Sequence, residues 1–591
     1  MSLTAKVVLG VALVAAALFL PSLGRAPFVD PPEGFHAVIA WEMLRHGDWI
    51  TPHINGVRYF DKPPLLYWLM AGGFRALGPG EAAARLGSAL PALGVAALTA
   101  WLGMRLGGAR VGLVAGLVVA ANLELFLFAR LVKPDLLLVL CILVAFTGLL
   151  EAYLRREEAR DGRWALLIFY AALGATALAK DILGALGPLA AVAVFFAVTR
   201  ERNVARRWIP WAGVLLFLAI AMPWYALVEA RNSGFLWYTV MDNHILNLAR
   251  HRVFPDEDVP LSALEFLAVT AIGFLPWCLA VPWALWRRLR GPWPTPEDRA
   301  WLLLAIWAAG SLAVFTLSPF KLPHYGLPAF PALALLVAKL WDEVLEGATG
   351  APSPRTLLAP PLLLFAVAAG AAFLAWRGYL TLPAGALPSA DVAARNVAAR
   401  GPDLPFMSGA QLAPLFRSLT AVFGLGALAA AAGLALRRPT LGLGALLAAM
   451  LAFLPFAAEG FELFARSRSV RMLGDAVALR AAPGDLLAHE GALENSGSWL
   501  LTLDPPGRAP VAAPVKVVNG LVSNLAFGAS FPEARDIFWD ADRLAAAWRG
   551  DRRIFLLSAA SAERSVTRTL PPDSLHLLLE AGGRRLYSNR P

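Results

Sequence analysis

Runs of about 20 apolar residues recur along this 591-residue chain, and no other feature of the sequence constrains its fold more tightly. A helix needs about that many apolar residues to cross a hydrocarbon core roughly 30 Å thick. Hydrophobic residues make up 58% of the chain and charged residues only 16%. Soluble globular domains carry about 45–50% and about 25%. The sequence therefore predicts a polytopic α-helical membrane protein.

Charge in the connections between these runs supports about thirteen spans. If Lys6 lies inside and the spans alternate, nearly every arginine-dense connection falls on the inside face, as the positive-inside rule requires. The same rule explains the formal net charge of +10, and no basic patch interleaved with aromatic residues is present, so nucleic acid is not an expected partner. The predicted spans centre near residues 14, 94, 118, 144, 171, 190, 219, 275, 308, 334, 366, 427 and 450.

The alternation divides the chain into a membrane domain over residues 1–460 and a domain on the outside face over 461–591. Long outside loops are expected at about 24–83, 230–262 and 377–416. Beyond about residue 461 the hydropathy falls and charged residues become frequent. Short apolar runs at 484–491, 513–520, 551–558 and 575–589 alternate with turns, and 531–550 has helical spacing. This pattern predicts a small periplasmic α/β domain.

Five cations on the outside face break the topology rule: Arg58, Lys62, Lys133, Lys180 and Lys321. Any single lysine near a membrane surface can simply extend its ammonium to the water, so each one alone is ambiguous. Together they favour anion binding, because ionisable groups near hydrocarbon are costly and commonly functional. A lipid phosphate at the bilayer surface is the anion that such cations fit best.

Acids and histidines share that face. An acid at a helix start also acts as a cap, and Asp135 after Pro134 fits that alternative reading. Carboxylates among cations either hold a divalent metal or act on an acceptor as a general base. Glycosyl transfer from a polyprenyl phosphate needs only a stabilised leaving phosphate and an aimed acceptor oxygen. The candidates are Asp30, Glu33, Asp61, Asp135, His244, His324 and Tyr325.

The stretch "WEMLRHGDWITPHINGVRYFDKPPLLYW" (41–68) resembles the first periplasmic loop of the GT-C membrane glycosyltransferases. Within these it most resembles the branch of the lipid A aminoarabinose transferases, which is related to the protein O-mannosyltransferases. Three further segments match in order: "KPDLLL" (133–138), "ALAKDIL" (177–183) and "KLPHYGLP" (321–328). The resemblance is in sequence to about residue 340 and architectural beyond it.

The resemblance implies roles for individual residues. Asp61 and His244 fall where the family has groups associated with a divalent metal (Zn, Mg or Mn), and Asp135 falls on the aspartate that the family needs for activity. The remaining matches are implied to surround the lipid phosphate of the donor. These are Arg58, Tyr59, Lys62, Lys180, Lys321, His324 and Tyr325.

One part of the first loop departs from the family. The family has Asp-Glu followed by arginine two residues on, whereas this chain has Pro32, Glu33 and Phe35 at those places. Three interpretations follow: Glu33 or Asp30 takes over as the catalytic acid, the acceptor chemistry differs, or the protein is inactive. An acceptor that is already a phosphate needs no strong base, whereas a hydroxyl acceptor does.

The sequence thus favours an inverting inner-membrane glycosyltransferase that moves a sugar from a polyprenyl-phosphate donor to a lipid, glycan or protein acceptor on the periplasmic side. A transporter or flippase of lipid-linked sugars is the main alternative. It would call for polar residues near mid-membrane and for repeated halves, and the sequence shows neither. An inactive scaffold is the other alternative.

Overall fold

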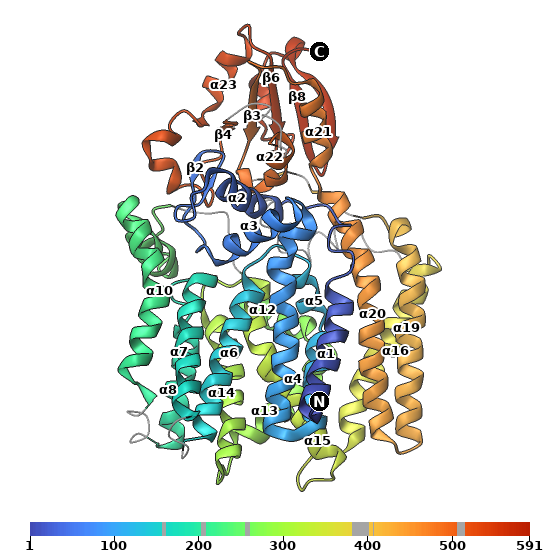
Figure 1. The fold of residues 1–591 in the computed structure, drawn as a ribbon. Helices are drawn as coiled ribbons and strands as arrows, with labels where there is room; N and C mark the ends of the chain where they lie inside the picture. Colours follow the sequence, from blue (N-terminus) through green and yellow to red (C-terminus); the bar gives the residue numbers. More distant parts are fainter. Residues whose placement is uncertain are drawn as a thin grey trace.

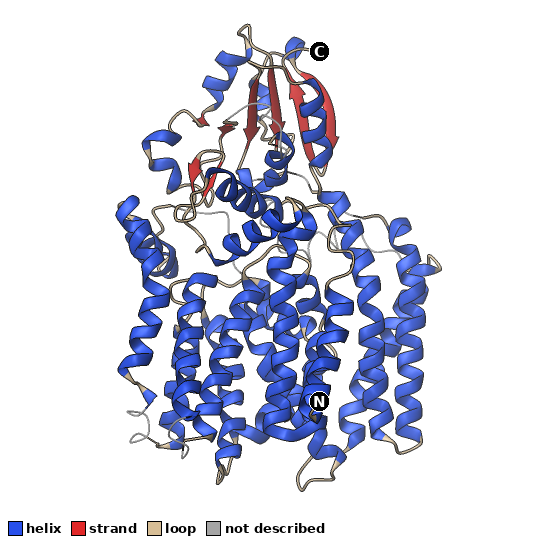
Figure 2. Cartoon of the chain, in the orientation of Figure 1, coloured by secondary structure: helices blue, strands red, loops and turns tan. Residues whose placement is uncertain are grey.

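The computed structural model describes residues 1–156, 161–201, 208–254, 261–380, 401–402, 404–405, 407–504 and 514–591. A bundle of long, roughly parallel helices forms one part, and a smaller domain with a β-sheet covers one end of the bundle (Figures 1 and 2). The end nearest this domain also carries a layer of short helices. The predicted combination of a helical membrane part with a C-terminal α/β domain is confirmed.

The bundle is built from helices that span its length and from shorter ones at its ends. Its helices are α1 (Leu3–Phe19), α4 (Glu81–Ala120), α5 (Leu123–Ala129), α6 (Asp135–Leu154), α7 (Asp161–Ala179), α8 (Leu186–Thr199), α10 (Trp211–Arg231), α12 (Ala263–Gly273), α13 (Val281–Leu289), α14 (Pro296–Leu317), α15 (Phe330–Leu345), α16 (Pro354–Trp376), α19 (Gly409–Ala435) and α20 (Pro439–Arg468). Shorter helical pieces are α11 (Phe235–Trp237), the π-helix η2 (Tyr238–Leu246), and the 3₁₀ helices η3 (Trp277–Ala280) and η4 (Pro323–Ala329).

Eight described helices are long and apolar enough to cross a membrane, or nine if the bent pair of α12 with η3 and α13 counts as one span. The predicted centres all lie in helices except the one near 275, which lies at the break in that pair. Two predicted spans, near 94 and 118, share α4, whose backbone is interrupted at Gly108 with φ of 81°. The number of crossings, predicted as about thirteen, stays a prediction.

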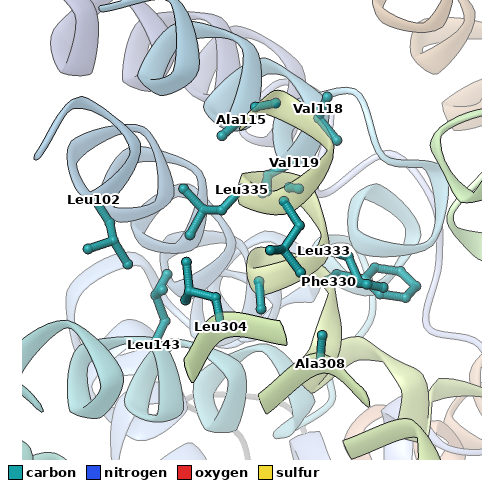
Figure 3. Close-up of a cluster of buried hydrophobic side chains, with 14 of the residues drawn as sticks. Leu102, Ala115, Val118, Val119, Leu143, Leu304, Ala308, Phe330, Leu333 and Leu335 are labelled. Atoms are coloured by element: carbon teal, nitrogen blue, oxygen red, sulfur yellow. The ribbon is translucent and has the colours of Figure 1, made fainter. Parts of the chain in front are cut away.

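The bundle core consists of aliphatic side chains from helices that are distant in sequence. Leu102, Leu143 and Leu304, from α4, α6 and α14, are each almost fully buried and lie together in Figure 3 with Leu335 of α15. Phe146 of α6 stacks on the Trp307 ring of α14 at 4.2 Å between ring centroids. This packing fixes the ends of α6, α14 and α15, where the candidate residues lie.

The predicted first outside loop is folded rather than extended. It contains α2 (Glu33–His46), the hairpin β1 (His53–Ile54) and β2 (Val57–Arg58), and α3 (Leu65–Leu77). Helix α2 packs on α3 and on the C-terminal domain, so most of its first two turns are buried. The predicted loop at 377–416 lies largely outside the described residues, since 381–400, 403 and 406 are among the gaps.

The C-terminal domain is a six-stranded mixed sheet with strand order β5-β4-β3-β6-β8-β7. Strands β5, β4, β3 and β6 run parallel, and β8 and β7 are antiparallel additions. Each of the four short apolar runs contains a strand, and 575–589 contains two, whereas 531–550, which has helical spacing, contains β5 as well as α23. Helix α20 continues to Arg468, past the boundary expected near 461. The domain comprises α21 (Arg471–Arg480), β3 (Leu486–Glu490), η5 (Leu493–Ser496), α22 (Gly497–Leu503), β4 (Lys516–Val518), η6 (Gly528–Ser530), η7 (Pro532–Ala534), β5 (Phe538–Trp539), α23 (Ala541–Trp548), β6 (Ile554–Ser558), η8 (Val566–Thr569), η9 (Pro572–Ser574), β7 (His576–Ala581) and β8 (Arg584–Ser588).

The C-terminal domain and α2 are in direct backbone contact. A Cβ atom added at Gly34 of α2 would lie 2.1 Å from the backbone nitrogen of Ser498, and one added at Gly497 would lie 2.2 Å from that of Phe35. Only glycine permits so close a crossing of α2 and α22. The fully buried Arg584 guanidinium donates to the Asp30 carbonyl at 2.9 Å and to the Asn495 carbonyl. The domain therefore fixes the start of α2.

Candidate active site

Asp135, Lys180 and His324 meet at the end of the bundle that faces the C-terminal domain. Asp135 is the first residue of α6, Lys180 directly follows α7, and His324 lies in η4, between α14 and α15. The Lys180 ammonium donates to Asp135 Oδ1, and His324 Nε2 lies 3.4 Å from the same oxygen. Lys180 Nζ is also 4.5 Å from the centroid of the Tyr325 ring. A buried carboxylate thus holds the lysine over an aromatic face.

Lys321 lies on the same segment as His324 and Tyr325. Its side chain is buried, with 6% exposure. Within the described part of the chain it makes no hydrogen bond and no ion pair. Burying an ammonium without a partner is costly, so a buried lysine in this state fits a site that binds an anion.

Asp61 and Lys62 form a second charged pair, at the end of the stretch before α3. Lys62 Nζ lies 2.5 Å from Asp61 Oδ2. Burial raises the pKa of Asp61, but the charge and hydrogen bond of Lys62, together with the charge of Arg252, outweigh it and leave that pKa below its usual value. Asp61 is therefore an ionised carboxylate at neutral pH. Lys62 is about one-third exposed, which leaves its ammonium accessible.

Tyr59 lies behind this pair. Its ring packs edge-on against Phe35 and Tyr67, with centroids 5.4 and 6.0 Å away. Burial holds the pKa of Tyr59 well above its usual value, so the phenol stays neutral. Tyr59 is 1% exposed, which makes it part of the packing under the site rather than an accessible phosphate ligand.

His36 of α2 lies close enough to both charged pairs for their charges to affect its pKa. Its Nδ1 lies 2.8 Å from the Tyr67 hydroxyl, and burial lowers its pKa to about 3. The ammonium groups of Lys133 and Lys62 act in the same direction on this pKa, from opposite segments of the chain. A histidine of α2 thus lies within electrostatic range of both the first loop and the segment before α6.

His244 is engaged on both ring nitrogens. Nδ1 lies 2.6 Å from the Thr239 carbonyl oxygen, and Nε2 lies 2.6 Å from Asp181 Oδ2. Burial lowers the pKa of His244, but the Asp181 carboxylate more than compensates and raises it above its usual value. Two acceptors on the two nitrogens favour the imidazolium, which has no lone pair for a metal.

These contacts do not fit the metal site expected from Asp61 and His244. Asp61 is paired with Lys62, and His244 with Asp181. Among the described residues, no group of three or more histidine, cysteine, aspartate or glutamate side chains is placed to hold a metal ion. The two predicted ligands thus belong to two separate ion pairs.

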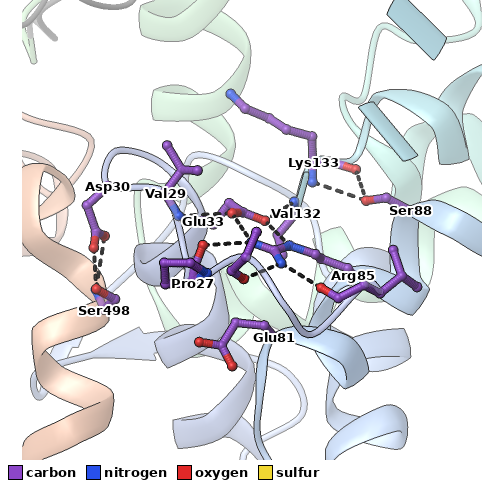
Figure 4. A network of polar contacts seen from close by, with 12 residues as sticks. Pro27, Val29, Asp30, Glu33, Glu81, Arg85, Ser88, Val132, Lys133 and Ser498 are labelled. Atoms are coloured by element: carbon purple, nitrogen blue, oxygen red, sulfur yellow. Dashed lines mark hydrogen bonds and ion pairs between the residues drawn. The ribbon is translucent and has the colours of Figure 1, made fainter. Parts of the chain in front are cut away.

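Glu33, a predicted catalytic acid, is buried and makes structural contacts that join α2 to α4 and to the segment before α6. Its carboxylate forms a two-pronged ion pair with Arg85 of α4, with Oε1 to Nε at 2.9 Å and Oε2 to Nη2 at 2.7 Å, and both side chains are at most 1% exposed. It also accepts the backbone N–H groups of Val29 and Val132, at 2.9 and 3.0 Å. Figure 4 shows the carboxylate enclosed by these donors. Glu33 has no open face toward a substrate.

Asp30 points away from Glu33 in Figure 4, toward the C-terminal domain. Its carboxylate accepts the backbone N–H of Ser498 at 3.0 Å and the hydroxyl of the same residue. Burial raises the pKa of Asp30 to about 6, partly offset by these bonds and by Arg584. Asp30 therefore joins the two domains, and neither of the two acids that could replace the family's missing aspartate is free to act as a base.

Arg58 is likewise used between domains. Its Nη1 donates to Asn232 Oδ1 at 2.8 Å, its Nε pairs with Glu533, and its guanidinium lies 4.3 Å from the centroid of the Phe531 ring. The β-hairpin turns Arg58 toward α10 and the C-terminal domain, although Asp61 is only three residues away. The expectation that Arg58 binds the donor phosphate does not fit these contacts.

Four ionisable residues at this end were given no individual role in the predicted site: His36, Lys133, Asp181 and Arg252. Lys133 and Asp181 lie within segments that the sequence marked, Lys133 as one of the outside cations in 133–138 and Asp181 as the neighbour of Lys180 in 177–183. His36 and Arg252 carried no such pattern. Arg252 pairs with Asp242 at 3.3 Å, and its charge reaches Asp61.

Comparisons with known proteins identify similar sequences and a similar fold. The family model described as dolichyl-phosphate-mannose-protein mannosyltransferase matches residues 29–239. The structure of ArnT from Cupriavidus metallidurans bound to undecaprenyl phosphate superposes with a TM-score of 0.79, at 25% identity, over 98% of either chain. The chain therefore resembles this mannosyltransferase family in sequence over residues 29–239 and shares the fold of ArnT over nearly its whole length.

Two curated relatives narrow the resemblance. Both carry the name undecaprenyl phosphate-alpha-4-amino-4-deoxy-L-arabinose arabinosyl transferase. The protein of Pseudomonas aeruginosa (strain LESB58) is 32% identical over 55% of this chain, and that of Edwardsiella ictaluri (strain 93-146) is 29% identical over 52%. The matches span only 58% and 54% of those relatives' own lengths. The sequence likeness thus covers little more than half of each relative.

Proposed function

We propose that this protein is an integral-membrane glycosyltransferase that uses a polyprenyl-phosphate-linked sugar as its donor. The observation that carries the proposal is the set of lysines at one end of the bundle: Lys180 held on Asp135, and Lys321, which is buried in η4's flanking segment and has no partner among the described residues. Several cations at a membrane surface fit a lipid phosphate. The similar ArnT structure holds undecaprenyl phosphate, which supports this class of donor.

The proposed reaction is a single displacement that inverts the anomeric carbon. The acceptor oxygen forms a bond to the anomeric carbon while the bond between that carbon and the donor's phosphate oxygen breaks. The electron pair of the broken bond stays on the polyprenyl phosphate. Lys62, Lys180 and Lys321 stabilise the charge that develops on the leaving phosphate. Asp135 acts as a positioning residue that fixes Lys180 above Tyr325.

If the acceptor is a hydroxyl, a carboxylate of the site must receive its proton. Asp30 and Glu33 are consumed by structural contacts, so Asp61 is the candidate to receive a proton from a hydroxyl acceptor. Its lowered pKa makes it a weak base, which suits an acceptor that is already ionised, such as a phosphate group. We therefore favour a phosphate-bearing lipid over a protein hydroxyl or a neutral glycan as the acceptor.

The proposed location is the bacterial inner membrane, with the C-terminal domain and the site on the periplasmic side. Of the arginine-dense connections predicted to lie inside, the described ones that follow α13, α15 and α19 occur at the opposite end of the bundle from this domain (Figure 1). That asymmetry is the one the positive-inside rule requires.

The test is transfer of sugar from a polyprenyl-phosphate-sugar by purified protein in proteoliposomes, with release of polyprenyl phosphate as the readout. We expect turnover by the unaltered protein and its loss in Asp135→Asn, since the amide cannot hold the Lys180 charge. Asp573→Asn, an exposed acid of the C-terminal domain, is the matched control and should keep full turnover. A flippase would move the donor across the bilayer without releasing polyprenyl phosphate, and that result would reject the proposal.

A further inference from the structure

A cavity of about 290 Å³ opens on the side of the bundle between α1, α5 and α20. The apolar part of its wall includes Ala17, Pro455 and Phe461. Arg130 and Glu459 also line it and carry opposite charges. The candidate active site uses none of these residues.

Arg130 is a buried cation that pairs with no carboxylate among the described residues. Its side chain is 6% exposed. Its Nη2 donates to the carbonyls of Leu18 and Pro21, at 3.1 and 2.8 Å, and its guanidinium lies 4.8 Å from the centroid of the Phe126 ring. Its Nε has no hydrogen-bond partner among the described residues. Capping the end of α1 accounts for one nitrogen and leaves the positive charge uncompensated.

Glu459 is an acid that, like Arg130, has no charged partner among the described residues. It is exposed on α20 and makes no hydrogen bond or ion pair within the described ranges. The other charged side chains of the cavity are compensated within the chain: Glu462 lies 2.8 Å from Arg466 and 3.9 Å from Arg25, and Arg85 is paired with Glu33. Among the described residues, one cation without a carboxylate and one carboxylate without a cation therefore line the same cavity.

The depth of the cavity points to a lipid. Glu459 follows the first residue of α20, Pro439, by 20 residues, which is about 30 Å along a helix and matches the hydrocarbon thickness. Glu459 therefore lies where the hydrocarbon ends, on the side of the C-terminal domain. Ala17 and Pro455 are exposed beside it, so acyl chains can extend from the cavity along α1 and α20.

We propose that this cavity binds the zwitterionic headgroup of a phosphoethanolamine phospholipid from the leaflet nearest the C-terminal domain. The lipid phosphate pairs with the Arg130 guanidinium, and the lipid ammonium pairs with the Glu459 carboxylate. Each partner supplies the charge that the chain itself leaves uncompensated. A phosphatidylglycerol headgroup satisfies Arg130 and leaves Glu459 unpaired, so it binds more weakly.

The test is native mass spectrometry of the full-length protein in detergent, titrated separately with phosphatidylethanolamine, phosphatidylglycerol, O-phosphoethanolamine and inorganic phosphate. We expect one phosphatidylethanolamine to bind about tenfold more tightly than phosphatidylglycerol. Glu459→Gln should remove that preference, and Glu563→Gln, at an exposed glutamate of the C-terminal domain, should keep it. Arg130→Gln should weaken both lipids.

Arg130 also caps α1, so its variant can fail to fold, whereas the exposed Glu459 carries the test without that risk. Equal binding of the two lipids by the unaltered protein, or an unchanged preference in Glu459→Gln, would overturn the proposal. Binding of O-phosphoethanolamine or inorganic phosphate as tight as that of phosphatidylethanolamine would also overturn it, because the site would then recognise a soluble anion rather than a lipid. Sugar transfer does not enter this readout, so failure here leaves the proposed function standing.

Discussion

Exchanging Glu33 for glutamine separates a structural role for this residue from a catalytic one. The carboxylate presents Oε1 to Arg85 Nε and the Val132 N–H, and Oε2 to Arg85 Nη2 and the Val29 N–H. An amide has only one acceptor oxygen. Whichever way it is turned, its NH₂ group faces two donors and the Arg85 charge loses its counter-ion.

The cost follows from burial. Both members of the pair are at most 1% exposed, and removing one partner from a buried ion pair costs about 3–5 kcal/mol. The loss also frees the segment before α6, since Val132 is only three residues from Asp135. We therefore expect Glu33→Gln to lower the thermal midpoint and the yield of folded protein.

The assay is the thermal unfolding midpoint of detergent-purified protein, followed by intrinsic fluorescence. Glu81→Gln is the control, because Glu81 forms a 3.6 Å pair with a largely exposed Arg471, and such pairs contribute about 0–1 kcal/mol. The double variant Glu33→Leu with Arg85→Leu should recover part of the loss, since no buried charge is left alone. A Glu33→Gln protein with an unchanged midpoint and no turnover would refute the structural role and restore Glu33 as a catalytic residue.

Three further predictions concern the contact between the two domains. Burial raises the pKa of Asp30 from 3.8 to about 6, so its contribution to stability is full below about pH 4 and is lost as the pH rises through 6. Asp30→Asn should flatten this part of a plot of unfolding midpoint against pH, and an unchanged slope would argue against the assignment. Gly34→Ala should separate α2 from α22, because the new methyl group meets the Ser498 backbone, and hydrogen exchange should rise in both helices. Arg58→Gln should cost about 1 kcal/mol at a partly exposed pair with Glu533, and it should leave donor affinity, measured by native mass spectrometry, within about twofold.

Hydropathy and charge alternation predicted the membrane helices and the strands β3, β4, β6, β7 and β8, because each depends on local pattern; β5 lies in 531–550, where helical spacing was found. Helix α2 was not predicted, because its burial comes from contacts with α3 and α22 and not from an apolar face visible in its own sequence. The partner that buries Gly34 and Phe35 lies more than 450 residues away in sequence.

For the candidate site, the sequence indicated which residues lie there better than it indicated which side chains contact one another. Asp135, Lys180 and His324 come from segments that were selected separately and meet in the structure. Asp30, Glu33 and Arg58 share a loop with Asp61, yet they point to Ser498, Arg85 and Glu533. Closeness in sequence does not determine direction in a folded loop, and no pattern in the first loop indicates the distant residues that bind these side chains.

The most direct test of the proposed donor is the mass of what the purified protein binds. Native mass spectrometry after incubation with an undecaprenyl-phosphate-sugar should show one bound donor on the unaltered protein. Lys321→Ala, which removes the buried cation, and Lys180→Ala should lose most of this binding, while Lys339→Ala, at the opposite end of the bundle, should retain it. Two results would contradict the assignment of this site to a lipid-linked sugar. One is the absence of bound donor on the unaltered protein, and the other is binding by the Lys321→Ala and Lys180→Ala variants that equals binding by the unaltered protein.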